Sequence, residues 1–397
     1  MRRLGLLGAL TVMVSMAAGH AGCASDRSSF DDGELPATSF ADAAVPEAQA
    51  QVCEPTLDSD LDGDGYTVAG GDCDDCDRNA NPGAYDIPGN GRDEDCSGVP
   101  DDEPSGCDAD LSIDSTDPFD GARALGLCRK VAADATGKAR TWGVVSARYV
   151  KPDRAPETEP LSHGILPDLG PNFLPFEGKR MLSLSTGLAR RPKDLPEDVW
   201  RKRAAKEYVH HAPPGFPHAP NACPDKPGGT PHDGAGFEVT IRVPTNARSF
   251  TFTHAFFTVE YPDYWCSVYN DVYVVIMTPK ITHDGNIAFD REGNTVGVNS
   301  ALLDHCQKYP LYSVPCGKGP AALEGTGFGT DAFADPTRPH GATSWLTTTA
   351  PVTGGTEITL FFAIWDSADP LLDSTIIADD FRWSAEQAAA EPETKVR

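Results

Sequence analysis

The segment from Asp58 to Cys107 constrains the fold of this chain more than any other, because it is densely acidic. Eighteen Asp or Glu residues and only two Arg residues lie between Glu54 and Asp110. Carboxylates at this density repel one another, so they cannot pack compactly unless cations neutralise them. Clustered carboxylate oxygens are the ligands that Ca²⁺ prefers. We therefore expect a calcium-binding module at 53–106, and the alternative is an acidic, disordered linker.

The spacing of the aspartates indicates where ions would bind. Asp60, Asp62 and Asp64 follow the pattern D-x-D-x-D-G, which places alternate carboxylates around a hard cation while glycine permits the sharp turn. The twelfth position of this loop is Gly71, so an EF-hand does not fit and Asp72 is expected to close the loop. A second run of alternate oxygens begins at Asp77. The ligands predicted for the two sites are Asp58, Asp60, Asp62, Asp64, Asp72, Asp74, Asp75, Asp77, Asn79, Asn81, Asn90, Asp93 and Asp95.

The N-terminus has the pattern of an export signal. Arg2 and Arg3 precede an apolar run at 4–18, which is too short to remain as a membrane span, so we expect residues 1–22 to be a signal peptide. Ala21-Gly22-Cys23 resembles a bacterial lipobox, in which the cysteine becomes lipidated. We expect Cys23 to attach the chain to the outer membrane or cell surface, with secretion as the alternative. Residues 23–52 are small, polar and acidic, as in a flexible tether.

The cysteine count agrees with an oxidising compartment. If Cys23 carries lipid, ten of the eleven cysteines remain, an even number that suits disulfides; cleavage beyond Cys23 would also leave ten. The expected partners outside the acidic segment are Cys107 with Cys128, Cys223 with Cys266, and Cys306 with Cys316. The complete set of disulfide candidates is Cys53, Cys73, Cys76, Cys96, Cys107, Cys128, Cys223, Cys266, Cys306 and Cys316.

The rest of the chain predicts a β-rich domain at 107–386 and a disordered tail at 387–397. Period-two alternation with Gly, Pro, Asn and Asp turns favours an antiparallel, jelly-roll-like β-sandwich. A helix is expected after Asp117-Pro118, a short basic helix at 194–208, and a Pro/Gly-rich loop at 210–235. The expected strands are 141–151, 179–187, 237–244, 249–261, 271–278, 286–290, 294–299, 356–366 and 374–383.

Two parts of the sequence resemble known families. The run GGDCDDCDRNANPGAYDIPGNGRDEDCSG is similar to the metal-binding repeat of the MopE type, which is abundant in exported proteins of myxobacteria and related bacteria. Its resemblance implies divalent cations held by the aspartates named above. The region from Cys107 to Ala385 resembles the choice-of-anchor L domain through MLSLSTG, FFTVEYPDYWCSVYNDVYVV, NIAFDREGNTVGVNS and FFAIWDSADPLLDSTIIADDF. It departs from that family's pattern at Val259, where glutamate is usual.

Polar residues at the predicted strand ends of this domain suggest a second metal site. Loops at strand ends can gather polar groups without disrupting a core, and a cation there would pin the loops together. The alternatives are that these groups accept hydrogen bonds from turns, or that two carboxylates act as the acid and base of a glycoside hydrolase. The residues concerned are Glu260, Asn270, Asp271, Asp366, Asp369 and Asp373.

Composition and motifs narrow the function classes. A net charge of −26 argues against nucleic-acid binding, which needs a basic surface. The sequence contains no GxSxG, HExxH or P-loop motif, so we do not expect an enzyme. We expect an exported, lipid-anchored surface protein that binds calcium structurally and acts in binding, adhesion or structure. Its partner would be a surface ligand such as a glycan or a cell-envelope protein. The alternative is a secreted carbohydrate-active or other hydrolytic enzyme.

Overall fold

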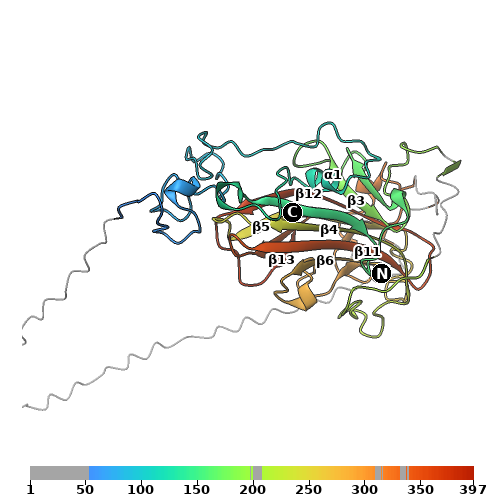
Figure 1. The fold of residues 1–397 in the computed structure, drawn as a ribbon. Helices are drawn as coiled ribbons and strands as arrows, with labels where there is room; N and C mark the ends of the chain where they lie inside the picture. The colour runs from blue at the N-terminus through green and yellow to red at the C-terminus, as the bar shows by residue number, and fades with distance from the viewer. Residues whose placement is uncertain are drawn as a thin grey trace, which may run out of the picture. The chain divides into compact units, whose positions relative to one another are not determined.

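Two antiparallel sheets form the body of the chain (Figure 1). The structure is a computed structural model that describes residues 53–397, apart from 197, 200–207, 309–313, 315, 331–336 and 338. The predicted signal peptide, Cys23 and the tether lie outside the described residues, as does most of the basic helix expected at 194–208. Every strand pair of the two sheets is antiparallel among the described residues.

The first sheet has five strands and the second has eight. In spatial order the first contains β1 (Gly143–Val150), β4 (Pro231–Arg242), β11 (Glu357–Ser367), β6 (Val272–Thr278) and β7 (Val296–Gly297). The second runs through β13 (Glu393–Val396), β10 (Leu346–Pro351), β5 (Ser249–Thr258), β12 (Ser374–Ser384), β3 (Met181–Ser185) and β2 (His163–Leu166). It is extended by β9 (Gly341–Thr343), which pairs with β5, and by β8 (Leu303–Cys306), which pairs with β9.

The core lies between the sheets. Phe237 and Phe362 of the five-stranded sheet belong to one buried cluster with Phe252 and Ile376 of the eight-stranded sheet. The rings of Phe252 and Phe362 meet edge to face, with centroids 5.5 Å apart. Side chains from two sheets that share one core define a sandwich. The prediction of a mainly β, antiparallel sandwich is therefore confirmed.

Loops cover the outer faces of both sheets. Phe216 packs against a buried cluster that includes Val274 and Trp365 on the five-stranded sheet. Phe173 covers the outer face of the eight-stranded sheet in the same way, with its ring 4.7 Å from that of Phe257. The central strands are consequently buried on both faces, whereas period-two alternation predicts burial on one face only.

Helix is scarce, as predicted. Helix α1 (Pro118–Ala124) begins where expected, with the Asp117 carboxylate accepting the Phe119 N–H at 2.9 Å. It ends at Ala124, because Gly126 adopts a φ of 101° and Leu127 N–H closes back on the Ala122 carbonyl. The 3₁₀ turns are η1 (Val68–Gly70), η2 (Gly137–Ala139), η3 (Pro160–Ser162), η4 (His283–Gly285) and η5 (Ala321–Leu323).

Several stretches differ from the expected secondary structure, among them β2, β8, β9 and β10, where no strand was expected. Residues 231–235, expected in a loop, form the start of β4. Residues 286–290, expected as a strand, make only isolated bridges, because Asn286 turns the chain by accepting the Val275 and Ala288 N–H groups through its side chain. The C-terminal stretch, expected as a disordered tail, contains β13, which pairs with β10. Four residues are too few to give a clear periodic signal.

The acidic segment folds as irregular loops against the sandwich. Its one element of regular structure among the described residues is η1. Asn246, which follows β4, donates to the Tyr85 carbonyl at 2.8 Å and accepts from the Tyr85 N–H at 3.1 Å. Thr245 donates to the Asn81 side-chain oxygen at 2.8 Å. These contacts place residues 53–106 in the same compact unit as the sandwich.

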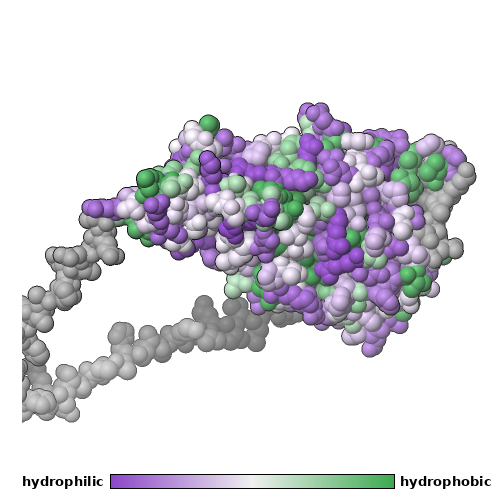
Figure 2. All heavy atoms as spheres, viewed as in Figure 1, coloured by the Kyte–Doolittle hydropathy of each residue, from purple (hydrophilic) through white to green (hydrophobic). Residues whose placement is uncertain are grey.

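The visible surface is largely hydrophilic, with apolar residues in small patches (Figure 2). In the described part of the chain, no helix combines the length and apolar character needed to span a bilayer.

Candidate metal centre

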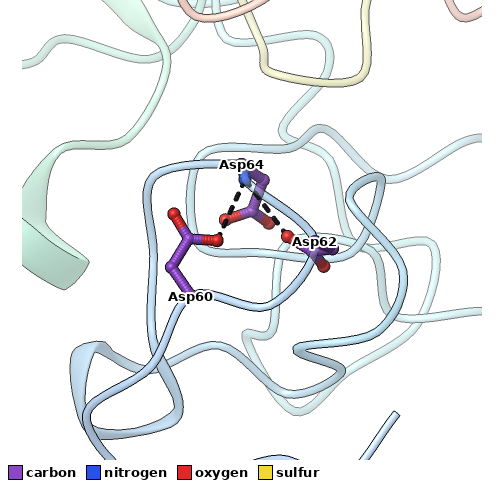
Figure 3. Close-up of side chains that lie close together, drawn as sticks. All are labelled: Asp60, Asp62 and Asp64. Carbon is purple, nitrogen blue, oxygen red and sulfur yellow. Dashed lines mark hydrogen bonds between the residues drawn. The ribbon is translucent and has the colours of Figure 1, made fainter. Parts of the chain in front are cut away.

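The first acidic loop curls so that three carboxylates face one another (Figure 3). Gly63 and Gly65 adopt positive φ angles of 76° and 98°, which permit the turn. Asp60 accepts the Gly63 N–H at 2.7 Å and the Gly65 N–H at 3.0 Å. Asp62 Oδ1 accepts the Asp64 N–H at 3.1 Å. One ligand oxygen from each of Asp60, Asp62 and Asp64 lies within 4.8 Å of the other two.

Two more carboxylates join this loop from the following turn. Asp72 is 4% exposed and Asp75 is 1% exposed, and an oxygen from each lies within 4.8 Å of an Asp62 oxygen and of the other. Asp75 Oδ1 accepts the Leu61 N–H at 2.9 Å, which fixes the turn against the loop. The structure therefore brings Asp72 to the position at which the spacing predicts that it closes the loop.

One oxygen of each of four aspartates has no hydrogen-bond partner and is shielded from solvent. The other oxygen of each accepts a backbone N–H. Buried polar atoms normally have partners, so these oxygens could accept a cation. Asp62 links the two groups of close carboxylates, Asp60 with Asp64 and Asp72 with Asp75. The four unpaired atoms are the Oδ2 atoms of Asp62, Asp64, Asp72 and Asp75.

Burial and mutual repulsion also affect the acidity of these groups. Burial raises the pKa of Asp64 to about 7, and the negative charges of Asp62 and Asp72 act in the same direction. The pKa values of Asp62 and Asp72 are raised for the same reasons. These raised pKa values favour protonation of the loop, and a bound cation would instead let the carboxylates stay ionised. A hard divalent ion fits a set composed only of oxygen ligands.

Interlocked disulfides hold this loop in place. The four cysteines of the module pair as Cys53 with Cys76 and Cys73 with Cys96, each across 23 positions. Asp72 and Asp75 flank or lie between Cys73 and Cys76, so both disulfides anchor the turn that supplies them. The pairings expected outside the module are confirmed as Cys107–Cys128, Cys223–Cys266 and Cys306–Cys316.

The residues predicted for a second site in the module do not come together as one group, and the Asn81 side chain lies within hydrogen-bonding reach of Asp64 in the first loop. Asp77 forms an ion pair of 2.8 Å with Arg92 and accepts a hydrogen bond from Asn79. Asn81 accepts the Gly83 N–H and the Thr245 hydroxyl.

The remaining predicted ligands also have local partners. Asn90 donates to Glu94 at 2.7 Å, and Asp93 accepts the Ser97 and Gly98 N–H groups. Asp58 and Asp74 are exposed and belong to no group of converging carboxylates among the described residues.

A different group forms in this part of the module. Asp86, Asp95 and Asp102 bring one oxygen each within 4.8 Å of one another. Asp86 already accepts three backbone N–H groups, and Arg129 pairs with Asp95 at 3.2 Å. Because a guanidinium already neutralises this group, it offers a weaker cation site than the first loop. Asp86 and Asp102 stand outside the alternate spacing, so the sequence carried no local signal for them.

The carboxylates of the sandwich gather at one end of the two sheets. Asp271 is fully buried, and its oxygens accept the Ser367 N–H at 3.0 Å and the Ser374 hydroxyl at 2.5 Å. The side chains of Glu260 and Asp366 both lie within hydrogen-bonding reach of Asp271. Burial, with these neighbouring negative charges, raises the pKa of Glu260 and of Asp366 well above the usual range, and burial raises that of Asp271 to about 7.

The other three residues predicted for this site surround that group. The Asn270 side chain accepts the Asn299 N–H at 2.8 Å and so fixes the loop that contains Asn299. Asp369 is half-buried and accepts the Leu371 N–H at 2.9 Å. Asp373 lies against Gly187, where an added Cβ would approach the Asp373 Oδ2 to 2.1 Å. That position must therefore be glycine for the aspartate to keep its place.

Two arrangements bear on the enzyme alternative. Glu260, Asp271 and Asp366 are each at most 3% exposed, so a polysaccharide could not reach them without rearrangement of the fold. Ser344 Oγ lies 3.1 Å from His305 Nε2, a distance seen in nucleophilic triads. The carboxylate of Asp304 contacts the serine itself at 2.8 Å and lies 4.0 Å from the same Nε2, whereas a triad needs the carboxylate on Nδ1.

Comparison with known proteins does not add a family. No family model matches the chain, and no match was found among curated proteins or among solved structures. The resemblances to the MopE-type repeat and to the choice-of-anchor L domain therefore stay predictions.

Proposed function

We propose that this chain is an exported surface protein whose acidic module binds calcium and stays ordered because of it. The observation that carries the proposal is a set of four solvent-shielded carboxylate oxygens without hydrogen-bond partners, on Asp62, Asp64, Asp72 and Asp75. Asp62 belongs to both groups of carboxylates in this loop whose oxygens lie within 4.8 Å of one another. The module has almost no regular structure, so neutralising these charges would stabilise loops that backbone hydrogen bonds alone hold weakly. Calcium here has a structural role and performs no chemistry.

A calcium titration of the chain after Cys23 tests this proposal. Binding should raise the free energy of unfolding by about 2.7 kcal/mol when free calcium is 100-fold above the dissociation constant. Asp64→Asn should weaken binding at least tenfold, because it removes an unpaired ligand oxygen. The matched control is Asp74→Asn, which removes the same charge from an exposed neighbour and should leave affinity nearly unchanged. An equal loss in both variants would mean that general charge, rather than this site, attracts the ion.

The binding role draws support from a pocket between the module and the sandwich. The pocket has a volume of about 420 Å³. Tyr85 and Glu103 from the module line it together with Trp142, Phe381 and Trp383 of the sandwich. Aromatic rings combined with a few polar groups suit a sugar ring, which has apolar faces and a polar rim. We propose a surface glycan as its ligand, and a glycan array probed with the calcium-loaded chain would identify it.

Attachment to the membrane rests on the sequence alone. The lipobox-like Ala21-Gly22-Cys23 supports a lipid anchor at Cys23. Cys23→Ser should move the protein from the membrane fraction to the soluble fraction after cell lysis. If the variant and the parent chain fractionate alike, the anchor proposal is wrong and the chain is exported without lipid.

A further inference from the structure

The end of the sandwich holds a second group of carboxylates, assembled from both sheets. Glu260 follows β5, Asp271 precedes β6, and Asp366 lies near the end of β11. β6 and β11 are neighbours in the five-stranded sheet, with Val272 paired to Trp365. β5 belongs to the other sheet, where Thr258 is paired to Ser374 at the start of β12. Strand ends from both layers therefore converge on this group, which we call the interior cluster (Glu260, Asp271 and Asp366).

Hydrogen bonds satisfy only part of the interior cluster. Asp271 has partners for both oxygens, Ser367 and Ser374. Glu260 is 3% exposed and its Oε2 has no partner; Asp366 is 2% exposed and neither of its oxygens has one. Both unpaired side chains lie beside the same buried carboxylate, because Asp271 is within hydrogen-bonding reach of each.

Among the described residues, no Lys, Arg or His forms an ion pair with Glu260, Asp271 or Asp366. The charged neighbours with the largest effect on Glu260 are Asp271, Asp366 and Asp369. Those that act on Asp366 are Asp271, Asp373 and Asp233. All are carboxylates, so each neighbour adds to the unfavourable charge. A buried carboxylate without a counter-ion strongly destabilises a fold, and three in contact require either cations or protons.

We propose that the interior cluster binds one divalent cation. Because all its ligands are oxygens, we expect this cation to be Ca²⁺, and the bound ion would hold the two sheets together at this end. The unpaired oxygens of Glu260 and Asp366 would supply ligands together with Asp271. The three do not bring one oxygen each within 4.8 Å of one another in this structure, so the ion would draw them closer. Ca²⁺ tolerates irregular coordination and a ligand number that backbone carbonyls can complete. The site shares no residue with the calcium loop of the module, so it extends the proposed function and does not depend on it.

The test uses the full chain after Cys23 with the module silenced by Asp62→Asn, Asp64→Asn and Asp72→Asn together. Equilibrium dialysis with Ca²⁺ alone should show one ion still bound. Terbium should also bind and emit on excitation of tryptophan, because the buried Trp365 is adjacent to Asp366. Adding Asp366→Asn or Glu260→Gln should abolish both signals, whereas Asp369→Asn, a neighbouring change of the same charge, should preserve them.

Several outcomes would overturn the inference. The first is that the silenced chain binds no ion. The second is that Asp86→Asn abolishes binding of the remaining ion while Asp366→Asn does not, because the ion would then lie in the module. If Asp366→Asn raises the melting temperature in calcium, the cluster shares protons and holds no metal. The two proposals fail separately. Equal ion counts in the parent and silenced chains would reject the module site alone. If the cluster variants do not fold, the test is whether the silenced chain still binds one ion and keeps it after Asp86→Asn.

Discussion

The module and the interior cluster both leave carboxylate oxygens unpaired, yet they are built in opposite ways. In the module the proposed ligands Asp62, Asp64, Asp72 and Asp75 lie within fourteen positions of one another on irregular loops. In the interior cluster Glu260, Asp271 and Asp366 come from three separate strand ends. The module's backbone has disulfides but almost no regular structure to hold it, whereas the strands hold the cluster in place. If both proposals hold, the ion organises the fold in the first case, and the fold organises the site in the second.

The largest expected effect comes from a substitution that weakens the packing between the two sheets. Phe362 is fully buried between them, so Phe362→Ala should cost about 3–5 kcal/mol of unfolding free energy. Because the interior cluster needs both sheets in register, its ion should be released at lower urea than the module's ion. Urea titrations followed by terbium emission and by calcium binding would measure the two releases. Simultaneous release would show that the module cannot order its loop without the sandwich.

The pH dependence should reveal the interior cluster when calcium is removed. An unfolded aspartate has a pKa of about 3.9, while burial raises that of folded Asp271 to about 7. The protonated form is thus favoured by folding, so its stabilisation is complete below about pH 4 and is lost as the pH rises through about 7. Each proton released lowers stability by about 1.4 kcal/mol per pH unit over this window.

Urea midpoints in chelator at about pH 5 and about pH 8 would measure this loss. The pKa values of Asp379 and Glu103 are also raised to about 7 by burial, so Asp271→Asn should flatten the decline without removing it. Saturating calcium should oppose the decline, because the ion replaces the protons. A chelated chain that becomes more stable between these two pH values would contradict the burial of uncompensated carboxyls.

The smallest expected effect is that of a substitution at Asp77, which tests which aspartates of the module are calcium ligands. Asp77 is paired with Arg92, whose side chain is 54% exposed. Asp77→Asn should therefore change stability by no more than about 0.5 kcal/mol, as is usual for exposed ion pairs. Its calcium affinity should match that of the parent chain in the same titration. A large drop in affinity would place Asp77 among the ligands, as its spacing first indicated.

The predictions that agree with the structure were made from patterns of residues close together in the sequence. The D-x-D-x-D-G run and Asp72 lie within one loop, so spacing alone could bring them together. The strand at 356–366 and its partners follow from their alternation and turns. The pattern of TEITLFFAIWD could not show that loops cover both faces, since the covering residue Phe216 is remote in sequence.

The second site predicted in the module shows what spacing leaves out. Asp77 and Asn81 have ligand-like spacing, but in the structure Arg92 pairs with Asp77 and Thr245 donates to Asn81. Asp86 and Asp102 have no such spacing, yet the folded loops bring them beside Asp95. Spacing cannot reveal a competing partner that arrives from elsewhere in the chain.

The sequence by itself determined the acidic module, its first loop, the class of fold and the cysteines available for pairing, because each follows from neighbouring residues. Tertiary structure alone decided which cysteines of the module pair and which carboxylates lose their partners. It also decided that Glu260, Asp271 and Asp366 meet beneath the surface. The physical reason is that charge compensation and burial depend on distances in space, which are set only when remote strands align.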